Sequence, residues 1–166
     1  PTQFFLDNKP IYNWSAISEN RSEDNKVYFE HMNKLGIIKE GYNKYNMSGI
    51  THHMMFNKYI VNDIIKYIED INKKKFIECF IENTICDKRS VFNKSGASEY
   101  EIYFNYILNN FQSKIILRKL NFIDTGLRVY NERAKDLNKN ILENLDEFLD
   151  YCENHWDYVS MHHYNR

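Results

Sequence analysis

Two carboxylates and an amide lie where the sequence predicts the start of a helix. The run Ser98-Glu99-Tyr100-Glu101 matches the capping box, in which a serine caps the helix and a glutamate three residues later bonds back to its amide. At about 100° per residue, Glu101 and Asn105 border one side of the apolar stripe, and Glu99 borders the other. A carboxylate beside such a stripe can face a cleft and accept a hydrogen bond from a sugar hydroxyl, or take its proton. Capping also accounts for Glu101, and the helix dipole accounts for Glu99, so both interpretations stay open.

Four of the 6 histidines form two adjacent pairs. His52 and His53 end an extended stretch just before a predicted helix, a junction where α/β folds often place binding sites. Neighbouring side chains of a strand point to opposite faces, so one imidazole would be free to recognise a hydroxyl. A bond to a backbone carbonyl or a helix cap is the alternative. In a second extended stretch, alternation puts His162 on the more polar face and His163 on the apolar one. These pairs lack the ligand number and spacing of a structural zinc site.

Composition narrows the class of protein. Hydrophobic residues make up 43% of the 166 residues and charged residues 27%, a globular balance. Lys and Arg total 22 against 23 for Asp and Glu, so no basic field favours nucleic acid as a partner. No apolar run is long enough to cross a bilayer. The 3 cysteines form no CxxC pair, which indicates reduced thiols, and we expect a cytoplasmic protein.

Helices alternate with short strands along the chain, which predicts an α/β or mixed α+β fold. With 2 Pro, 5 Gly and no linker-like stretch, we expect one domain over residues 1–166, and the opening at Pro1 without Met indicates a piece of a longer protein. The predicted helices are Val27–Leu35 ending at Gly36, a stripe from Phe56 to Ile71, Lys75–Ile85, Ser98–Asn110 and Asp136–Asn154. The predicted strands or extended stretches are Ile11–Ser15, Tyr42–Thr51, Lys114–Leu120 and Tyr158–Tyr164.

Five stretches, taken in order, resemble a family of glycosyltransferase-like proteins with the GT-A fold. Two of them are fairly specific, the run His52-His53-Met54-Met55-Phe56 and the run from Ser98 to Tyr106. The shorter matches are Pro1–Phe5, Tyr28–Met32 and Tyr158–Tyr164. The resemblance covers most of the chain and is least secure between Arg118 and Asp157. It implies part of a GT-A-like sheet with helices packed on it.

The resemblance implies transfer of a sugar from a nucleotide-sugar donor to the hydroxyl of a glycan or other acceptor, assisted by Mn²⁺ or Mg²⁺. His162 would be the metal-binding histidine of the C-terminal region. Glu99 or Glu101 would be the catalytic carboxylate on the acceptor side, as base or as hydroxyl clamp. The substrate-binding residues would be His52, His53, Asn105 and His163.

One departure from the family is serious, because no D-x-D motif and no Gly-rich phosphate loop occur in the 166 residues. The half that grips the nucleotide is therefore missing from this sequence, and we do not expect the chain to turn over alone. One alternative is a non-catalytic carbohydrate- or protein-binding domain. A second is a helical interaction protein whose histidines and glutamates are ordinary surface and capping residues.

Overall fold

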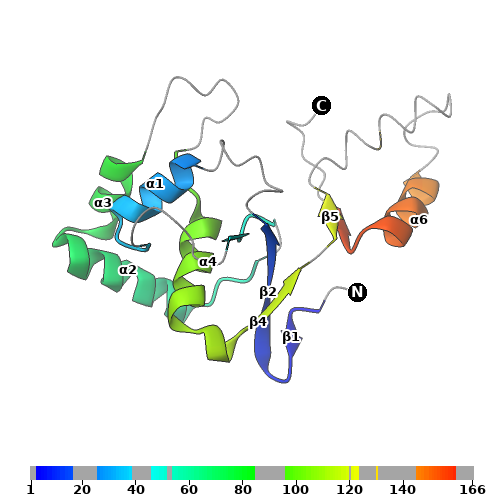
Figure 1. Ribbon diagram of the computed structural model, residues 1–166, viewed down its shortest axis with the longest axis horizontal. Coiled ribbons are helices and arrows are strands. Elements are labelled where there is room, and N and C mark those ends of the chain that lie inside the picture. The colour runs from blue at the N-terminus through cyan, green and yellow to red at the C-terminus, as the bar shows by residue number, and fades with distance from the viewer. Residues whose placement is uncertain are drawn as a thin grey trace. The chain divides into compact units, whose positions relative to one another are not determined.

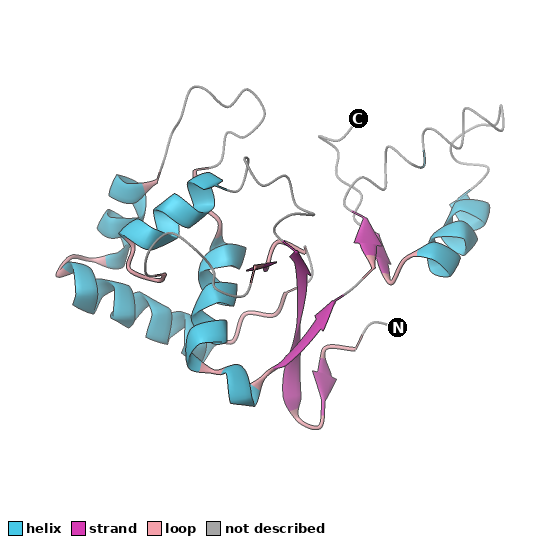
Figure 2. Ribbon diagram, viewed as in Figure 1, coloured by secondary structure: helices cyan, strands magenta, loops and turns pink. Residues whose placement is uncertain are grey.

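The computed structural model describes residues 3–16, 26–38, 46–51, 54–84, 96–119, 121–123, 130 and 145–159. These residues form helices and short strands (Figure 1 and Figure 2), which confirms the predicted mixed α+β class. The chain packs into two compact units, one of residues Phe4–Arg118 and one of Pro1–Gln3 together with Lys119–Arg166. That the whole chain is one domain stays a prediction.

The described helices are α1 (Lys26–Lys34), α2 (Lys58–Asn72), α3 (Phe76–Asn83), α4 (Glu99–Asn110) and α6 (Leu145–His155), with a 3-10 turn at Gln112–Lys114. The described strands are β1 (Phe5–Leu6), β2 (Lys9–Ala16), β3 (Met47–Ser48), β4 (Ile116–Lys119), β5 (Phe122–Ile123) and β6 (Tyr158–Val159).

Strand β2 is the centre of a four-stranded sheet. It runs antiparallel to β1 and to β3 and also pairs with β4. Asp7 and Asn8, which join β1 to β2, have positive φ angles of 49° and 60°. A two-residue hairpin loop needs this left-handed backbone, and Asp and Asn tolerate it well. The turn signals after residue 6 thus close a hairpin, and the sequence did not predict its first strand.

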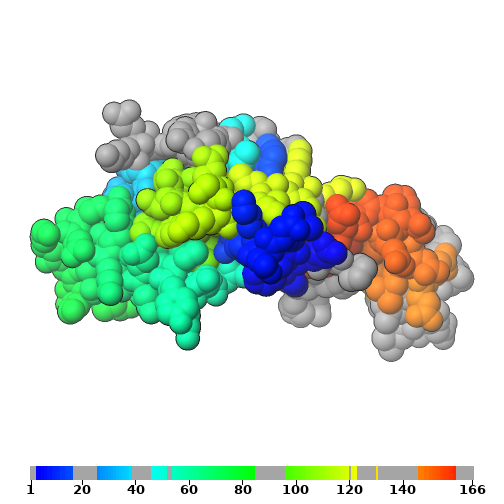
Figure 3. Space-filling view, turned by 90° about the horizontal axis from the view of Figure 1, so that it is seen from below, coloured from blue at the N-terminus to red at the C-terminus, as the bar shows by residue number. Residues whose placement is uncertain are grey.

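Large apolar side chains remain exposed on this hairpin. Phe4, Phe5 and Leu6 are 42%, 58% and 48% exposed, and Figure 3 shows the hairpin in blue on one face of the molecule. Strand β1 is an edge strand of the sheet. An apolar edge strand of this kind is a surface on which chains tend to associate.

Helix α1 ends where the sequence predicts. Gly36 has a φ of +79°, the N–H of Ile37 bonds to the carbonyl of Met32 at 3.0 Å, and the N–H of Gly36 bonds to Asn33 at 3.0 Å. This is the Schellman arrangement, in which a left-handed glycine closes the helix. Met32 and Ile37 are both buried, so the same turn returns the chain to the core.

The predicted periodic helix is α2, although its stripe begins later than expected. Asn57 caps the helix, since its side-chain oxygen accepts the N–H of Tyr59 at 2.9 Å, and Phe56 therefore lies before the helix. Ile64 and Ile68 are buried, whereas Ile71 is 49% exposed. The prediction was wrong at its first residue because apolar spacing alone does not show which turns meet the core, whereas Ile71 lies in the helix as predicted.

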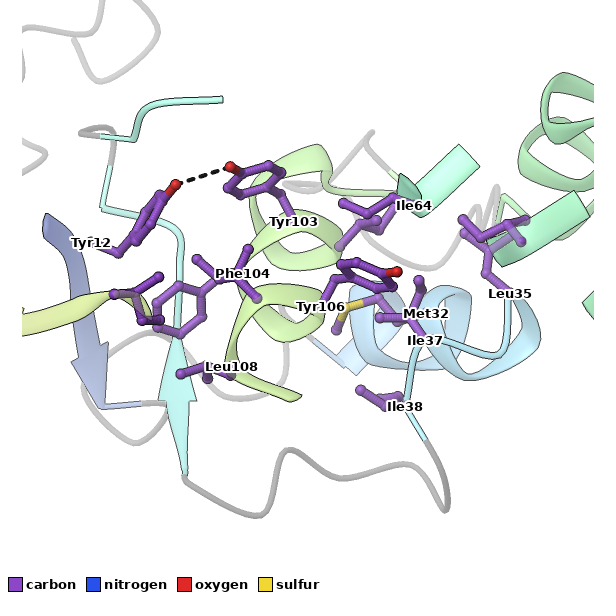
Figure 4. Close-up of a cluster of buried hydrophobic side chains, with 14 of the residues drawn as sticks. Tyr12, Met32, Leu35, Ile37, Ile38, Ile64, Tyr103, Phe104, Tyr106 and Leu108 are labelled. Carbon is purple, nitrogen blue, oxygen red and sulfur yellow. Dashed lines mark hydrogen bonds between the residues drawn. The ribbon is translucent and has the colours of Figure 1, made fainter. Parts of the chain in front are cut away.

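Helix α4 is the core of the larger unit. Every residue from Glu101 to Leu108 is buried, although the sequence predicted only one apolar stripe with Glu101 and Asn105 at its border. The helix packs against α1 and α2. In Figure 4, Phe104 and Leu108 lie on one side of it, and Tyr106 lies on the other, near Met32. A helix covered on all sides buries its polar residues too, which a helical wheel does not show.

The smaller unit contains α6 and the parallel pair β5 and β6. Its apolar cluster consists of Tyr130, Phe148 and Cys152, with Trp156 packed against them. The sequence predicted a helix from Asp136 and a strand to Tyr164, of which residues 136–144 and 160–164 lie outside the described residues. No helix in the described parts of the chain has the length and apolar composition needed to span a bilayer.

Candidate functional site

The first turn of α4 holds a carboxylate with no exposed surface. Glu101 is 0% exposed, and its N–H donates to the hydroxyl of the N-cap Ser98 at 3.3 Å, as the capping box predicts. The carboxylate itself does not bond back to Ser98. It accepts the hydroxyl of Ser48, the N–H of Gly49 at 3.3 Å and the side-chain amide of Asn105 at 3.1 Å. Glu101 therefore joins α4 to the end of β3.

Asn105 lies one turn beyond Glu101 on the same side of α4. Its amide nitrogen donates to a carboxylate oxygen of Glu101 at 3.1 Å and to the backbone carbonyl of Glu101 at 2.9 Å. Asn105 is 2% exposed. The structure thus brings together two residues that the wheel placed side by side. Asn105 orients the carboxylate and has little surface for a ligand.

Gly49 lies against α4 more closely than any other residue type would allow. A Cβ atom at this position would lie 2.6 Å from Cγ of Phe104 and 3.0 Å from Cε of Met54. Glycine is therefore required for close approach, not for its φ angle. The next residues turn locally, because the N–H of Ile50 donates to the Ser48 hydroxyl at 3.2 Å and that of Thr51 donates to the Gly49 carbonyl at 2.9 Å.

A second set of contacts attaches residues 56 and 57 to the same helix. The ring of Phe56 meets those of Tyr100 and Tyr103 edge to face, with centroids 5.6 Å and 4.9 Å away. The N–H of Asn57 donates to the Tyr103 hydroxyl at 3.0 Å, and this hydroxyl also bonds to that of Tyr12 at 2.9 Å (Figure 4). The described chain on both sides of residues 52 and 53 is therefore anchored on α4.

The environment of Glu101 favours a neutral carboxyl group. Burial raises its pKa to about 7, and the hydrogen bonds from Ser48, Gly49 and Asn105 only partly oppose this rise. One oxygen accepts two N–H donors, while the other faces the Ser48 hydroxyl. A hydroxyl can accept as well as donate. The proton of the neutral form therefore belongs on the oxygen that faces Ser48.

The predicted site residues fall into two groups. Glu99 is exposed on the first turn of α4, while Glu101 and Asn105 are buried beneath it. The predicted histidines, His52, His53, His162 and His163, lie outside the described residues. A catalytic role for Glu101 stays a prediction, and it would require the carboxylate to be uncovered.

Ser48 and Gly49 belong to the site, and sequence reasoning missed their role. The sequence places Gly49 only within the predicted extended stretch Tyr42–Thr51. A small residue followed by glycine inside a strand pattern is the signal that could have found them, because it marks close backbone approach.

The expected divalent cation has no cluster of ligands in the described ranges of the chain. No group of three or more His, Cys, Asp or Glu side chains within metal-binding reach occurs among the described residues. Both oxygens of Glu101 already face hydrogen-bond donors, which leaves them poor ligands. His162, the ligand expected from the resemblance, lies outside the described residues, so the divalent cation stays a prediction.

The two more specific stretches of the resemblance meet in the fold. Residues 54–56 and 98–106 belong to segments held together by the contacts of Glu101, Phe56 and Tyr103. This proximity is a property of the fold and does not identify a family. Comparison with known protein families, with curated proteins and with solved structures gives no match, and the resemblance to glycosyltransferases stays a prediction.

Proposed function

We propose that this chain is the acceptor-side part of a glycosyltransferase-like protein, which transfers a sugar from a nucleotide-sugar donor to an acceptor hydroxyl. The segment of the donor half that carries a D-x-D motif does not occur in these residues. In this proposal the chain binds the hydroxyl-bearing acceptor and needs the donor half for transfer.

The observation that carries the proposal is the attachment of residues 48–49 and 56–57 to the start of α4. Ser48 and Gly49 bond to Glu101 at one end, and Phe56 and Asn57 contact Tyr100 and Tyr103 at the other. His52 and His53 lie between these anchored ends in the sequence. Imidazole, carboxylate and aromatic groups are the side chains that bind sugar hydroxyls and pack on sugar faces.

At the start of α4, the two glutamates take different roles in the proposal. Glu99 is exposed in the first helical turn, so it is the carboxylate that an acceptor hydroxyl reaches directly. Glu101 has no exposed surface and three donors, so it organises the protein around the acceptor. This assignment makes Glu99 the stronger candidate for hydroxyl contact.

A titration with oligosaccharides tests the proposal. We expect saturable NMR shifts of the backbone amides of residues 48–51 and 98–101 when an acceptor-type oligosaccharide is added. Glu99→Gln should weaken binding about tenfold, because a hydrogen bond to a charged group contributes about 1.5 kcal/mol or more. Glu78→Gln on α3 is the matched control, since Glu78 is also an exposed glutamate in the first turn of a helix.

The outcome that contradicts the proposal is also clear. If no sugar gives saturable shifts, whether or not a nucleotide sugar and Mn²⁺ are present, the acceptor-side assignment fails. Equal weakening in Glu99→Gln and Glu78→Gln would place binding elsewhere on the chain.

A second candidate, a non-catalytic carbohydrate-binding domain, is favoured by the enclosure of Glu101. A carboxylate with three donors and no exposed surface is already satisfied and does not act as a base in this state. Binding that ignores Mn²⁺ and nucleotide supports this candidate. A hydrolysis or transfer signal from a nucleotide sugar that disappears on adding chelator supports the enzyme.

A further inference from the structure

We propose that Glu101 is a proton-operated latch, which holds residues 46–51 on α4 while its carboxyl group is neutral and loosens them when it is ionised. The latch would act on the segment beside the proposed acceptor site. Its physical operation does not depend on the proposed function, and only its biological purpose rests on it.

The geometry of the latch joins two segments far apart in sequence. Ser48 and Gly49 bond to the carboxylate, and 53 and 52 positions of sequence separate them from Glu101. Gly49 presses its backbone on Phe104 and Met54, with no room for a Cβ atom. Strand β3, two residues long, also pairs with β2 on its other side. Glu101 therefore attaches this segment to α4, separately from its pairing with β2.

A buried hydroxyl without a partner lowers the free energy needed to open the segment. Thr51 is 0% exposed, and its hydroxyl oxygen has no hydrogen-bond partner among the described residues. A buried hydroxyl without a partner loses its bonds to water and regains them when the segment opens. The segment from Asn46 to Thr51 is thus held by a few specific bonds against an unfavourable term.

No charged group in the described residues compensates an ionised Glu101. The groups that face it are the Ser48 hydroxyl and Gly49 amide from the β3 side and the Asn105 amide from α4, all of them uncharged. The titratable neighbours on α4 are turned elsewhere, because Glu99 is exposed and the Tyr103 hydroxyl bonds to Tyr12. Ionisation consequently leaves a buried charge held by uncharged donors alone, and opening gives that charge to water.

The pKa of Glu101 in the open and closed states decides how the opening equilibrium changes with pH. In the open segment the carboxyl group has an ordinary pKa near 4.5, and in the closed segment burial raises the pKa to about 7. The closed state therefore binds the proton more tightly, and opening becomes more favourable as the pH rises from 4.5 to 7. The opening constant should increase by about two orders of magnitude across the titration, because a pKa difference of about 2.5 sets an upper limit of about 300-fold.

Amide hydrogen exchange on the 166-residue chain between pH 4 and pH 8 measures this directly. The reporters are the N–H groups of Gly49 and Ile50, which bond to Glu101 and Ser48. After correction for the intrinsic exchange rate, we expect their opening constants to rise by about two orders of magnitude. At each pH, the opening constants of Gly49 and Ile50 should be at least tenfold larger than those of Ile64 and Ile68 in the buried face of α2.

Matched variants test whether the Glu101 carboxyl group causes the pH dependence of opening. Glu101→Gln keeps the shape of the neutral form, so its opening constants should stay at the low value over the whole pH range. Glu99→Gln, two residues away and exposed, should reproduce the wild-type pH dependence. Ser48→Ala removes one bond of the latch and should raise the opening constant at low pH even if Glu101→Gln folds poorly.

Two results would overturn the latch. If Gly49 and Ile50 exchange with the same opening constants as Ile64 and Ile68 at every pH, the segment opens only when the unit unfolds. If their opening constants do not change between pH 4 and pH 8 in the wild-type chain, Glu101 does not control the segment. The measurement uses no ligand, so neither result decides the proposed function.

Discussion

Two buried titratable residues of the larger unit oppose each other in their pH dependence. Glu101 on α4 has a raised pKa because burial disfavours its carboxylate. His31 on α1 has a lowered pKa because burial disfavours its imidazolium, although a hydrogen bond to the Phe80 carbonyl at 3.2 Å acts in the other direction. As the pH rises toward 6.5, ionisation of Glu101 lowers the free energy of unfolding while deprotonation of His31 raises it, so the two effects partly offset each other.

Glu101→Gln should remove a loss of the free energy of unfolding that the wild type shows as the pH rises from 4.5 to 7. The folded state binds the Glu101 proton more tightly than the unfolded chain, so its stabilising effect is complete below pH 4.5 and is lost as the pH rises to about 7. The lost free energy is on the order of 3 kcal/mol, at about 1.4 kcal/mol per pKa unit. Urea denaturation of both proteins from pH 4 to pH 8 measures the difference, and parallel curves would refute the expectation.

His31→Leu should remove a loss of stability at acid pH. Because the folded state binds the His31 proton less tightly than the unfolded chain, the wild type loses stability as the pH falls below 6.5. At pH 8 the variant should be about 1 kcal/mol less stable, since the Phe80 carbonyl loses its donor. The gap should narrow as the pH falls, and denaturation at pH 8 and pH 5 measures it. A gap that widens toward acid pH would show that His31 is not buried as a neutral group.

At the scale of elements, α4 is held in place by polar contacts as well as by apolar packing. Ser98 caps its first turn, Glu101 binds the end of β3, and Tyr103 links the N-terminus of α2 to Tyr12 of β2. Tyr106 adds a bond from its hydroxyl to Asp63 of α2 at 2.7 Å. Glu101, Tyr103 and Tyr106 thus connect α4 to β3, β2 and α2, so the helix orients its neighbours.

Gly49→Ala should destabilise the contact between β3 and α4. The added methyl group would lie 2.6 Å from Cγ of Phe104, so the segment or the ring must shift. Overpacking of this kind costs about 1–3 kcal/mol. Thermal unfolding measures the loss, and hydrogen exchange should place the increase at Gly49 and Ile50. An unchanged melting temperature would mean that Gly49 is not pressed on α4. Gly36→Ala is a poor control, because Gly36 has a positive φ angle and would be strained by its backbone.

At the scale of the whole molecule, each of the two units has an apolar cluster of its own. The larger cluster is built from β2, α1, α2, α3 and α4, whereas the smaller one contains Tyr130, Phe148 and Cys152. A segment with its own core can fold alone if it is large enough to bury sufficient apolar surface.

Residues 4–118 expressed alone should therefore fold cooperatively. We expect a single sigmoidal urea transition by circular dichroism, and a pH dependence of stability like that of the full chain, because Glu101 and His31 both lie in this unit. A fragment without a cooperative transition would show that the smaller unit is needed for folding, as the sequence-based expectation of one domain implies.

Local features of the sequence predicted much of the secondary structure. The apolar spacing in α2, the cap at Ser98 and the stop at Gly36 predicted three helices and the mixed α+β class, because periodicity and capping act within a turn or two of the chain. Tertiary structure alone decided that Glu101 is buried, and it supplied Ser48 and Gly49 as partners from 53 and 52 positions away. The surface of a helix is assigned to core or solvent only by the elements packed on it, and nothing in the local pattern of residues 98–110 records that β3 would come to lie there.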